Sequence, residues 1–189
     1  NAVSIRRTLY SRARVSARDD YIGPVISKTV LNSRGMPEWR YEKRRSFLAR
    51  AGQLAGKIVI PGYKQKKCPE YVVYESLRDV PNQIWNDPRM IVERFLPGSM
   101  RLPIVKHRFS FFYEAEINHS ASYDSVLCDP ETMTAFDVVP DVPAAIRNLR
   151  ADLQLDYGAI DYFMVEGEAI PIDANKTVTE TASWVAKVP

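Results

Sequence analysis

Two aspartates near the end of the chain, Asp161 and Asp173, have the spacing of a metal-binding pair. Each lies within a short apolar run, and Glu166–Glu168 between the runs predicts a hairpin with a three-residue loop. In that register Asp161 lies directly opposite Asp173, and Asn175 shares their face, because side chains alternate along a strand. The opposite face then carries six apolar residues, Ile160, Tyr162, Met164, Ile170, Ile172 and Ala174.

The chemistry that suits this pair is the binding of a hard divalent cation. Facing carboxylates in a hairpin repel each other, and Mg²⁺ would remove that repulsion through oxygen ligands. We therefore predict that Asp161, Asp173 and Asn175 are Mg²⁺ ligands. Two alternatives stay open. A two-residue loop would place the aspartates on opposite faces, and solvated positions on a surface hairpin would show the same pattern.

The uneven distribution of charge favours an anionic ligand or partner. The formal net charge is +3, but residues 1–67 carry +12, which leaves −9 for the remainder. Two lobes of opposite charge that close on a phosphate-rich, metal-bearing ligand would explain this asymmetry. Lys28, within the predicted strand 22–31, could reach such a phosphate. A basic first third is also typical of nucleic-acid-binding proteins, and ordinary solvated charge explains it equally.

Length and composition indicate one globular domain or two small lobes. The 189 residues are 46% hydrophobic and 26% charged, which is ordinary for a soluble protein with a sizeable core. No apolar run approaches the roughly 18 residues that span a bilayer. Cys68, Cys128, His107 and His119 are isolated, so we predict reduced cytoplasmic thiols and no zinc site.

Hydrophobic periodicity and turn residues predict an α+β fold. Helices are expected at 2–14, 39–55, 80–85 and 142–153, the last opened by Pro143. Strands are expected at 22–31, 57–63, 70–74, 90–96, 108–117 and 123–128, followed by the hairpin. The sequence contains no internal repeat and no linker that divides it cleanly.

Residues 22–177 resemble the ATP-grasp superfamily, in its glutathione-synthetase-like and ribosomal-protein glutamate ligase-like branch. The most specific part is Gly158-Ala159-Ile160-Asp161 followed by Ile172-Asp173-Ala174-Asn175. The resemblance implies two α+β lobes with ATP between them and two Mg²⁺ ions held on the phosphates by the acidic residues and the asparagine. Asp173 stands where the family more often has glutamate.

The resemblance also implies roles for residues of the first lobe. Lys28 would contact the nucleotide phosphates beneath a closing loop at 32–38. Glu93 and the backbone of Arg94 and Leu96 would meet the adenine edge in a hinge strand. ATP and Mg²⁺ are therefore the expected cofactors.

In the second lobe the resemblance implies two catalytic candidates, Arg108 and Lys106. Either would steady the γ-phosphate or the acyl-phosphate intermediate. Ser99 and Met100 occupy the stretch where the family often has a ribose-binding acid. Lys176 and Val178 depart from the residues that usually follow the metal ligands, on the side where the acceptor binds.

The implied function is a Mg²⁺-dependent ligase that joins a carboxylate to an amine or a thiol through an acyl phosphate. The expected domains are a basic N-terminal segment at 1–21, an N-lobe at 22–96 and a C-lobe at 97–189 with the metal-binding hairpin. The family's N-terminal substrate domain has no counterpart before Ile22, so we expect it to be missing or shortened. Expected substrates are small-molecule or peptide carboxylates and amines, in the cytoplasm and without a membrane partner. Homo-oligomerisation is left open.

Two other functions stay open at this stage. The first is a degenerate ATP-grasp domain that binds nucleotide or serves as an interaction module without ligase activity. The second is a basic nucleic-acid-binding protein that uses the arginine-rich first third.

Overall fold

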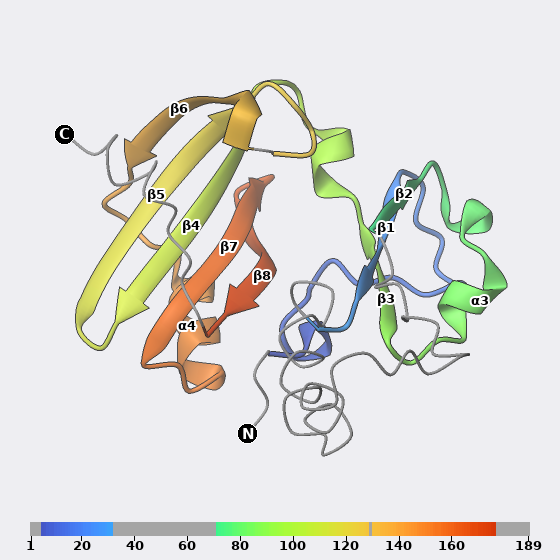
Figure 1. Ribbon diagram of the computed structural model, residues 1–189, viewed down its shortest axis with the longest axis horizontal. Helices are drawn as coiled ribbons and strands as arrows, with labels where there is room; N and C mark the ends of the chain where they lie inside the picture. The colour runs from blue at the N-terminus through green and yellow to red at the C-terminus, as the bar shows by residue number, and fades with distance from the viewer. Residues whose placement is uncertain (1–4, 32–70, 129, 177–189) are drawn as a thin grey trace, which may run out of the picture.

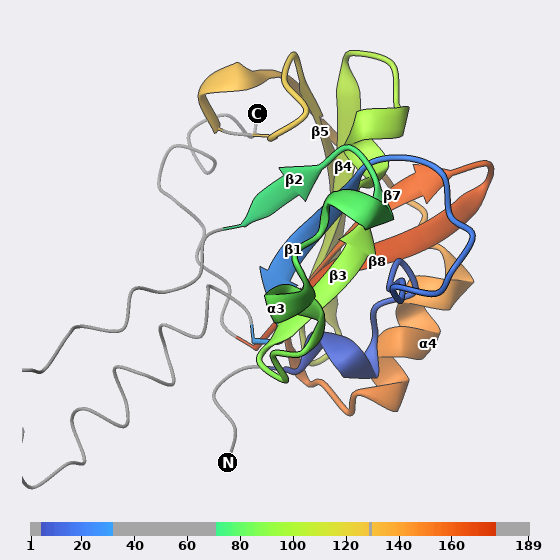
Figure 2. The same cartoon turned by 90° about the vertical axis from the view of Figure 1, so that its right-hand side faces the viewer.

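The chain folds into two antiparallel sheets with few helices, which confirms the α+β prediction (Figure 1). The computed structural model describes residues 5–31, 71–128 and 130–176. The expected loop 32–38, helix 39–55 and strand 57–63 lie outside the described residues. The smaller sheet has the strand order β2-β1-β3, and the larger one has the order β6-β5-β4-β7-β8. Figure 2 shows the smaller sheet in front of the larger one.

The smaller sheet is built from short, β-branched runs that were expected as strands. Its members are β1 (Val25–Thr29), β2 (Val72–Tyr74) and β3 (Met90–Arg94). Val25 and Val92 are buried in its core together with Leu77 and Val80. The short helix α3 (Asn82–Trp85) begins directly after Pro81, whose fixed φ suits a helix start.

The larger sheet has one face covered by a helix and one face turned toward the smaller sheet. Its strands are β4 (Ile104–Phe112), β5 (Ala115–Tyr123), β6 (Met133–Val138), β7 (Tyr157–Val165) and β8 (Glu168–Asn175). Helix α4 (Ala144–Asp152) follows Pro143 and buries Ile146 against Phe109 and Ile160. On the other face, Phe163 packs with Leu96, which lies in the connection from the smaller sheet.

The N-terminal segment packs against both sheets and lies between them in Figure 1. Ile5 and Tyr10 belong to the core beneath α4, whereas Val15 belongs to the core of the smaller sheet. The expected helix at 2–14 is wrong in its described part. Only Arg7–Leu9 form a 3-10 turn, and Arg14 then pairs with Glu93 as an isolated β-bridge. The loose apolar pattern of this segment reflects contacts to two cores, not one helix face.

Two expected strands are wrong, the first because it misses a hairpin and the second because it continues past the end of a strand. The predicted strand 108–117 spans the turn between β4 and β5, in which Tyr113 has a φ of 51°. The alternating aromatic residues continue up to this turn, so the pattern did not reveal the reversal. The predicted strand 123–128 is also wrong. Tyr123 ends β5, and Cys128 lies in the following turn region with a φ of 52°.

The β7–β8 hairpin has a two-residue loop where a three-residue loop was expected. Glu166 and Gly167 have φ values of 51° and 84°, which suits a tight hairpin turn. Tyr162 nevertheless pairs with Pro171 and Asp161 with Asp173, so Ile172 is an extra residue in β8. This bulge restores the pairing that the shorter loop alone would have lost.

The same bulge changes which residues share a face. Ile160, Tyr162 and Ala174 lie in the core beneath α4 as expected. Ile170 and Ile172 instead pack with the cluster on the opposite face, and Met164 is exposed. Within residues 5–31, 71–128 and 130–176, no helix is long and apolar enough to span a membrane.

Candidate functional site

A cleft of about 450 Å³ lies between the two sheets and gathers most of the candidate residues. Its walls come from both sheets and from the N-terminal segment. Seven of the nine candidates line it, namely Lys28, Glu93, Arg94, Leu96, Lys106, Asp161 and Asp173. The other two, Arg108 and Asn175, each bind one of the lining aspartates. Residues far apart in the sequence therefore meet at one site.

Asp161 is held by Arg108 in a two-pronged ion pair. The Nε and Nη2 atoms of Arg108 donate to the two carboxylate oxygens at 2.6 and 3.0 Å. The two residues face each other across neighbouring strands, β4 and β7, which fixes the geometry. The hydrogen bonds to Asp161 raise the pKa of Arg108, so the guanidinium stays charged.

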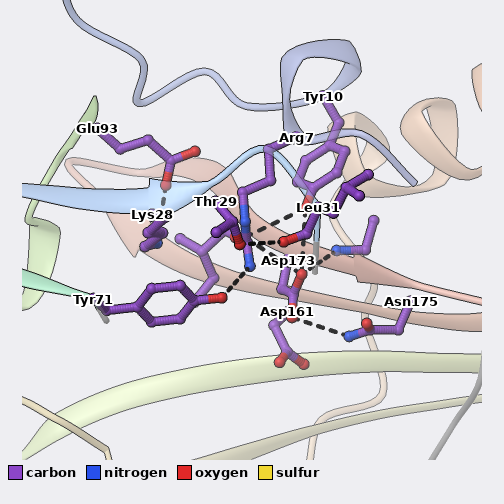
Figure 3. Close-up of polar contacts among 12 residues, drawn as sticks. Arg7, Tyr10, Lys28, Thr29, Leu31, Tyr71, Glu93, Asp161, Asp173 and Asn175 are labelled. Carbon is purple, nitrogen blue, oxygen red and sulfur yellow. Dashed lines mark hydrogen bonds and ion pairs between the residues drawn. The ribbon is translucent and has the colours of Figure 1, made fainter. Parts of the chain in front are cut away.

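Asp173 is surrounded by donors from the N-terminal segment and from its own strand, β8 (Figure 3). Its Oδ1 accepts hydrogen bonds from the Tyr10 hydroxyl at 3.2 Å and from the Ala174 amide at 3.1 Å. The Nη1 atom of Arg7 lies 3.4 Å from the same oxygen, and Asn175 Nδ2 donates to Oδ2 at 3.1 Å. Both aspartates of the hairpin thus have an arginine partner, which reduces the repulsion that first suggested a metal.

Arg7 is the residue of the site that the sequence reasoning missed. Only 3% of it is exposed. Its Nη1 donates to the Ile172 carbonyl at 2.7 Å, and its Nη2 to the Tyr71 hydroxyl at 3.4 Å. Burial by itself lowers the pKa of Arg7, but Asp173 together with Tyr10, Tyr71 and Glu93 outweighs burial, so the net shift is upward. The spacing of three residues between Arg7 and Tyr10 suits one face of a 3-10 turn, but it does not distinguish Arg7 from the other arginines of this segment.

Lys28 and Glu93 form the ion pair of the smaller sheet. The Nζ of Lys28 lies 2.9 Å from Glu93 Oε2, and Glu93 is almost fully buried. Burial alone would raise the pKa of Glu93, but Lys28, with smaller contributions from Ser11 and Arg7, outweighs burial and lowers it. The carboxylate expected at the adenine edge is therefore directed to Lys28. The Arg94 amide, expected there too, donates to the Ala13 carbonyl at 2.7 Å.

Two further ionisable groups lie on the cleft side of the larger sheet. Lys106 lines the cleft, with its Nζ 5.2 Å from the centre of the Tyr123 ring. His119 lies opposite Arg108 in the β4–β5 register and is 6% exposed. Burial lowers the pKa of His119 to about 4, helped by the positive charges of Arg108 and Lys106. A neutral imidazole next to the Arg108–Asp161 pair leaves that pair undisturbed.

The donor set fits Mg²⁺ by its chemistry. Asp161 and Asp173 face each other across β7 and β8, and Asn175 lies two residues further along. Two carboxylates and an amide oxygen are the hard ligands that Mg²⁺ takes in proteins, usually with water and substrate phosphates. Within the described residues no group of three or more histidine, cysteine, aspartate or glutamate side chains could hold a metal. A metal at this site would therefore need the Asn175 amide oxygen and oxygens of a bound phosphate as further ligands. It would also compete with Arg108 and Arg7 for the two aspartates.

Comparisons with known proteins find similarity to solved structures but no match in sequence. No protein-family model and no curated protein sequence matches the chain. Its fold is similar to the crystal structure of a D-alanine–D-alanine ligase from Bacillus anthracis, with 12% sequence identity and a TM-score of 0.40. The match covers 81% of this chain and 43% of that one, so this chain spans less than half of that ligase. A similarity of this size carries no argument about function, which has to come from the site.

Proposed function

We propose that this protein is an ATP-dependent ligase with an ATP-grasp fold, which activates a carboxylate as an acyl phosphate and transfers it to an amine or a thiol. The cleft between the two sheets carries this proposal. Its volume of about 450 Å³ falls within the roughly 300–1,000 Å³ of ligand pockets. Basic side chains from both sheets and two facing aspartates meet there, which suits a phosphate chain.

The charge of the cleft supports an anionic ligand. Three acidic residues line it, Glu93, Asp161 and Asp173, against four basic residues, Arg7, Lys28, Arg94 and Lys106. Arg108 adds a fifth cation through its pair with Asp161. An excess of cations at a partly buried site attracts and holds phosphate.

The residues of the cleft suit the two steps of such a reaction. A substrate carboxylate oxygen attacks the γ-phosphorus of ATP and ADP leaves; an amine then attacks the acyl carbon and releases phosphate. Both steps need alignment and charge neutralisation more than covalent help. Lys28, Lys106 and Arg108 would bind phosphate oxygens, while Phe95 and Phe163 provide apolar surface that excludes water. Mg²⁺ held by the hairpin residues would supply further neutralisation.

A second candidate function is an interaction module without ligase activity. The observation that favours it is that each acidic residue of the cleft already has a basic partner on the protein. Glu93 pairs with Lys28, Asp161 with Arg108 and Asp173 with Arg7. A site that neutralises its own carboxylates in this way does not require a metal nucleotide to be stable.

The deciding experiment is calorimetric titration of the full chain with ATP, with and without Mg²⁺. We expect Mg²⁺-dependent binding that Asp173→Asn abolishes, because this change removes a ligand charge while keeping the shape. Lys28→Ala should weaken ATP binding by about 10- to 100-fold, the worth of a charge-assisted hydrogen bond, and leave adenosine within about twofold. Asp137→Asn and Arg78→Ala change exposed charges elsewhere and serve as matched controls.

The possible outcomes separate the functions. If Lys28→Ala weakens the binding of ATP and of adenosine equally, Lys28 does not bind phosphate. No ATP binding at millimolar concentration would leave the interaction module as the better function. Binding of RNA or DNA that weakens steeply with salt and is unaffected by Asp173→Asn would instead favour a nucleic-acid-binding protein.

A further inference from the structure

Arg7 has more hydrogen-bonding capacity than its surroundings satisfy. Its guanidinium is buried at the cleft, where Asp173, at 3.4 Å, is its only acidic partner within hydrogen-bonding range in the part of the chain that the structure describes. Its Nε is buried and has no hydrogen-bond partner among the described residues. Burying a charged group with incomplete partners is costly, so a purely structural role explains this placement poorly.

The position of Arg7 is fixed by the backbone around it. Its amide donates to the Val30 carbonyl at 2.8 Å, just beyond β1. Its Nη1 donates to the carbonyl of Ile172, the bulged residue that precedes Asp173. The guanidinium is therefore held between the smaller sheet and the metal-ligand end of β8 (Figure 3). A phosphate bound between Lys28 and the hairpin would therefore lie next to the Arg7 guanidinium.

We propose that Arg7 is a further ligand-binding residue of this cleft, which competes with a divalent cation for Asp173 and binds the phosphates of the nucleotide. This inference rests on the proposed function, since it takes Asp173 as a metal ligand and a polyphosphate as the cleft's ligand. Arg7 then has opposite effects on two ligands. It weakens the binding of a divalent cation alone, and it strengthens the binding of a phosphate chain.

The opposite signs follow from electrostatics. A guanidinium 3.4 Å from Asp173 reduces the attraction of that carboxylate for another cation, and the effect is large where water is excluded. Removing the charge should raise the affinity for a divalent cation by at least about tenfold, since about 1.4 kcal/mol suffices for that change. It should lower the affinity for metal-free ATP by a similar factor, because one phosphate partner is lost.

The test uses Mn²⁺ as a probe for the metal, measured by the electron paramagnetic resonance signal of the free ion. The full chain is titrated with Mn²⁺ without nucleotide, and separately with ATP in the presence of a chelator. Arg7→Met is compared with the wild type and with Arg12→Met, an exposed arginine of the same segment. We expect Arg7→Met to bind Mn²⁺ more tightly and metal-free ATP more weakly, and Arg12→Met to change neither by more than about twofold.

A second variant covers the case in which Arg7→Met does not fold. Tyr10→Phe removes the 3.2 Å hydrogen bond to Asp173 Oδ1 but keeps the charge of Arg7. Because one competitor for that oxygen is lost, Mn²⁺ should bind a few-fold more tightly, while the affinity for metal-free ATP stays unchanged.

The results distinguish the inference from the function beneath it. If the wild type binds ATP with Mg²⁺ but Arg7→Met leaves both affinities unchanged, Arg7 is structural and the inference is overturned alone. If Arg7→Met loses affinity for both Mn²⁺ and ATP, Arg7 does not compete with the cation for Asp173, and the inference is overturned. If neither wild type nor variants bind Mn²⁺ or ATP, the proposed function and the inference fall together.

Discussion

His119 provides a test of the electrostatics at this site that does not depend on any ligand. It is 6% exposed, lies opposite Arg108 in the sheet and has its ring centre 4.8 Å from that of Phe136, with the two rings tilted by 34°. Burial, with Arg108 and Lys106 as further causes, lowers its pKa from 6.5 to about 4. The perturbation is His119→Gln, which keeps a polar side chain but removes the titration.

The sign of the pH effect follows from proton binding. Because the folded-state pKa of His119 is lowered, the unfolded chain binds its proton more readily. The contribution to stability is complete above pH 6.5 and is lost progressively as the pH falls toward 4. A shift of this size corresponds to a loss of about 1.4 kcal/mol at pH 5.5 and about 2.5 kcal/mol at pH 4.5.

Urea unfolding of wild type and His119→Gln at pH 7.5, 5.5 and 4.5 measures this loss. Carboxylates also titrate in this range, so the informative quantity is the difference between the two proteins at each pH. The variant should be less stable at pH 7.5, since it loses the contact with Phe136. Between pH 7.5 and pH 4.5 the unfolding free energy of the wild type should fall by about 2.5 kcal/mol relative to that of the variant. If the two curves stay parallel, His119 titrates normally and the account of this buried face is wrong.

Two further predictions concern the hairpin and the smaller sheet. Gly158→Ala would place a Cβ 2.3 Å from the Asn175 carbonyl oxygen. We therefore expect a loss of about 1–3 kcal/mol in unfolding free energy and weaker Mg²⁺-dependent binding of ATP. The control for both measurements is Gly167→Asn, because a Cβ at Gly167 has no atom within 4 Å. Glu93→Gln removes the negative charge that lies 2.9 Å from the Lys28 ammonium, so urea unfolding should show a loss of about 3 kcal/mol. A loss below about 1 kcal/mol would show that the ion pair contributes little to stability.

The pairing of Asp161 with Asp173 could be predicted from the sequence, although the loop that was assumed is wrong. The two aspartates are twelve positions apart, and an uninterrupted hairpin with the observed two-residue loop would place them on opposite faces. The bulge at Ile172 compensates for the shorter loop. Pro171, which cannot donate to the ladder, lies directly before the bulge and was the available signal. Alternation of side chains shows which residues share a face only where the ladder is regular.

The contribution of the N-terminal segment could not be predicted, because it depends on contacts between distant parts of the chain. Arg7 meets Ile172 and Asp173 across more than 160 positions. Periodicity and turn chemistry report only on neighbours within a few residues. An arginine three positions before a tyrosine has no distinguishing pattern until the fold brings both to Asp173. The interpretation of the charge asymmetry as two oppositely charged lobes stays a prediction, because Arg94, Lys106 and Arg108 at this cleft come from the acidic remainder of the chain.

The two arginine–aspartate pairs differ in strength, and this difference predicts which aspartate a divalent cation would bind first. Arg108 donates two hydrogen bonds to Asp161, at 2.6 and 3.0 Å, and the Asp161 side chain is 9% exposed. Arg7 makes one longer contact of 3.4 Å with Asp173, whose side chain is 25% exposed. Two-pronged pairs are the stronger ones, so a divalent cation should reach Asp173 first and displace Arg7 before it disturbs Arg108. On this reasoning Arg108→Lys, which loses the second hydrogen bond, should affect the binding of Mn²⁺ alone less than Arg7→Met does.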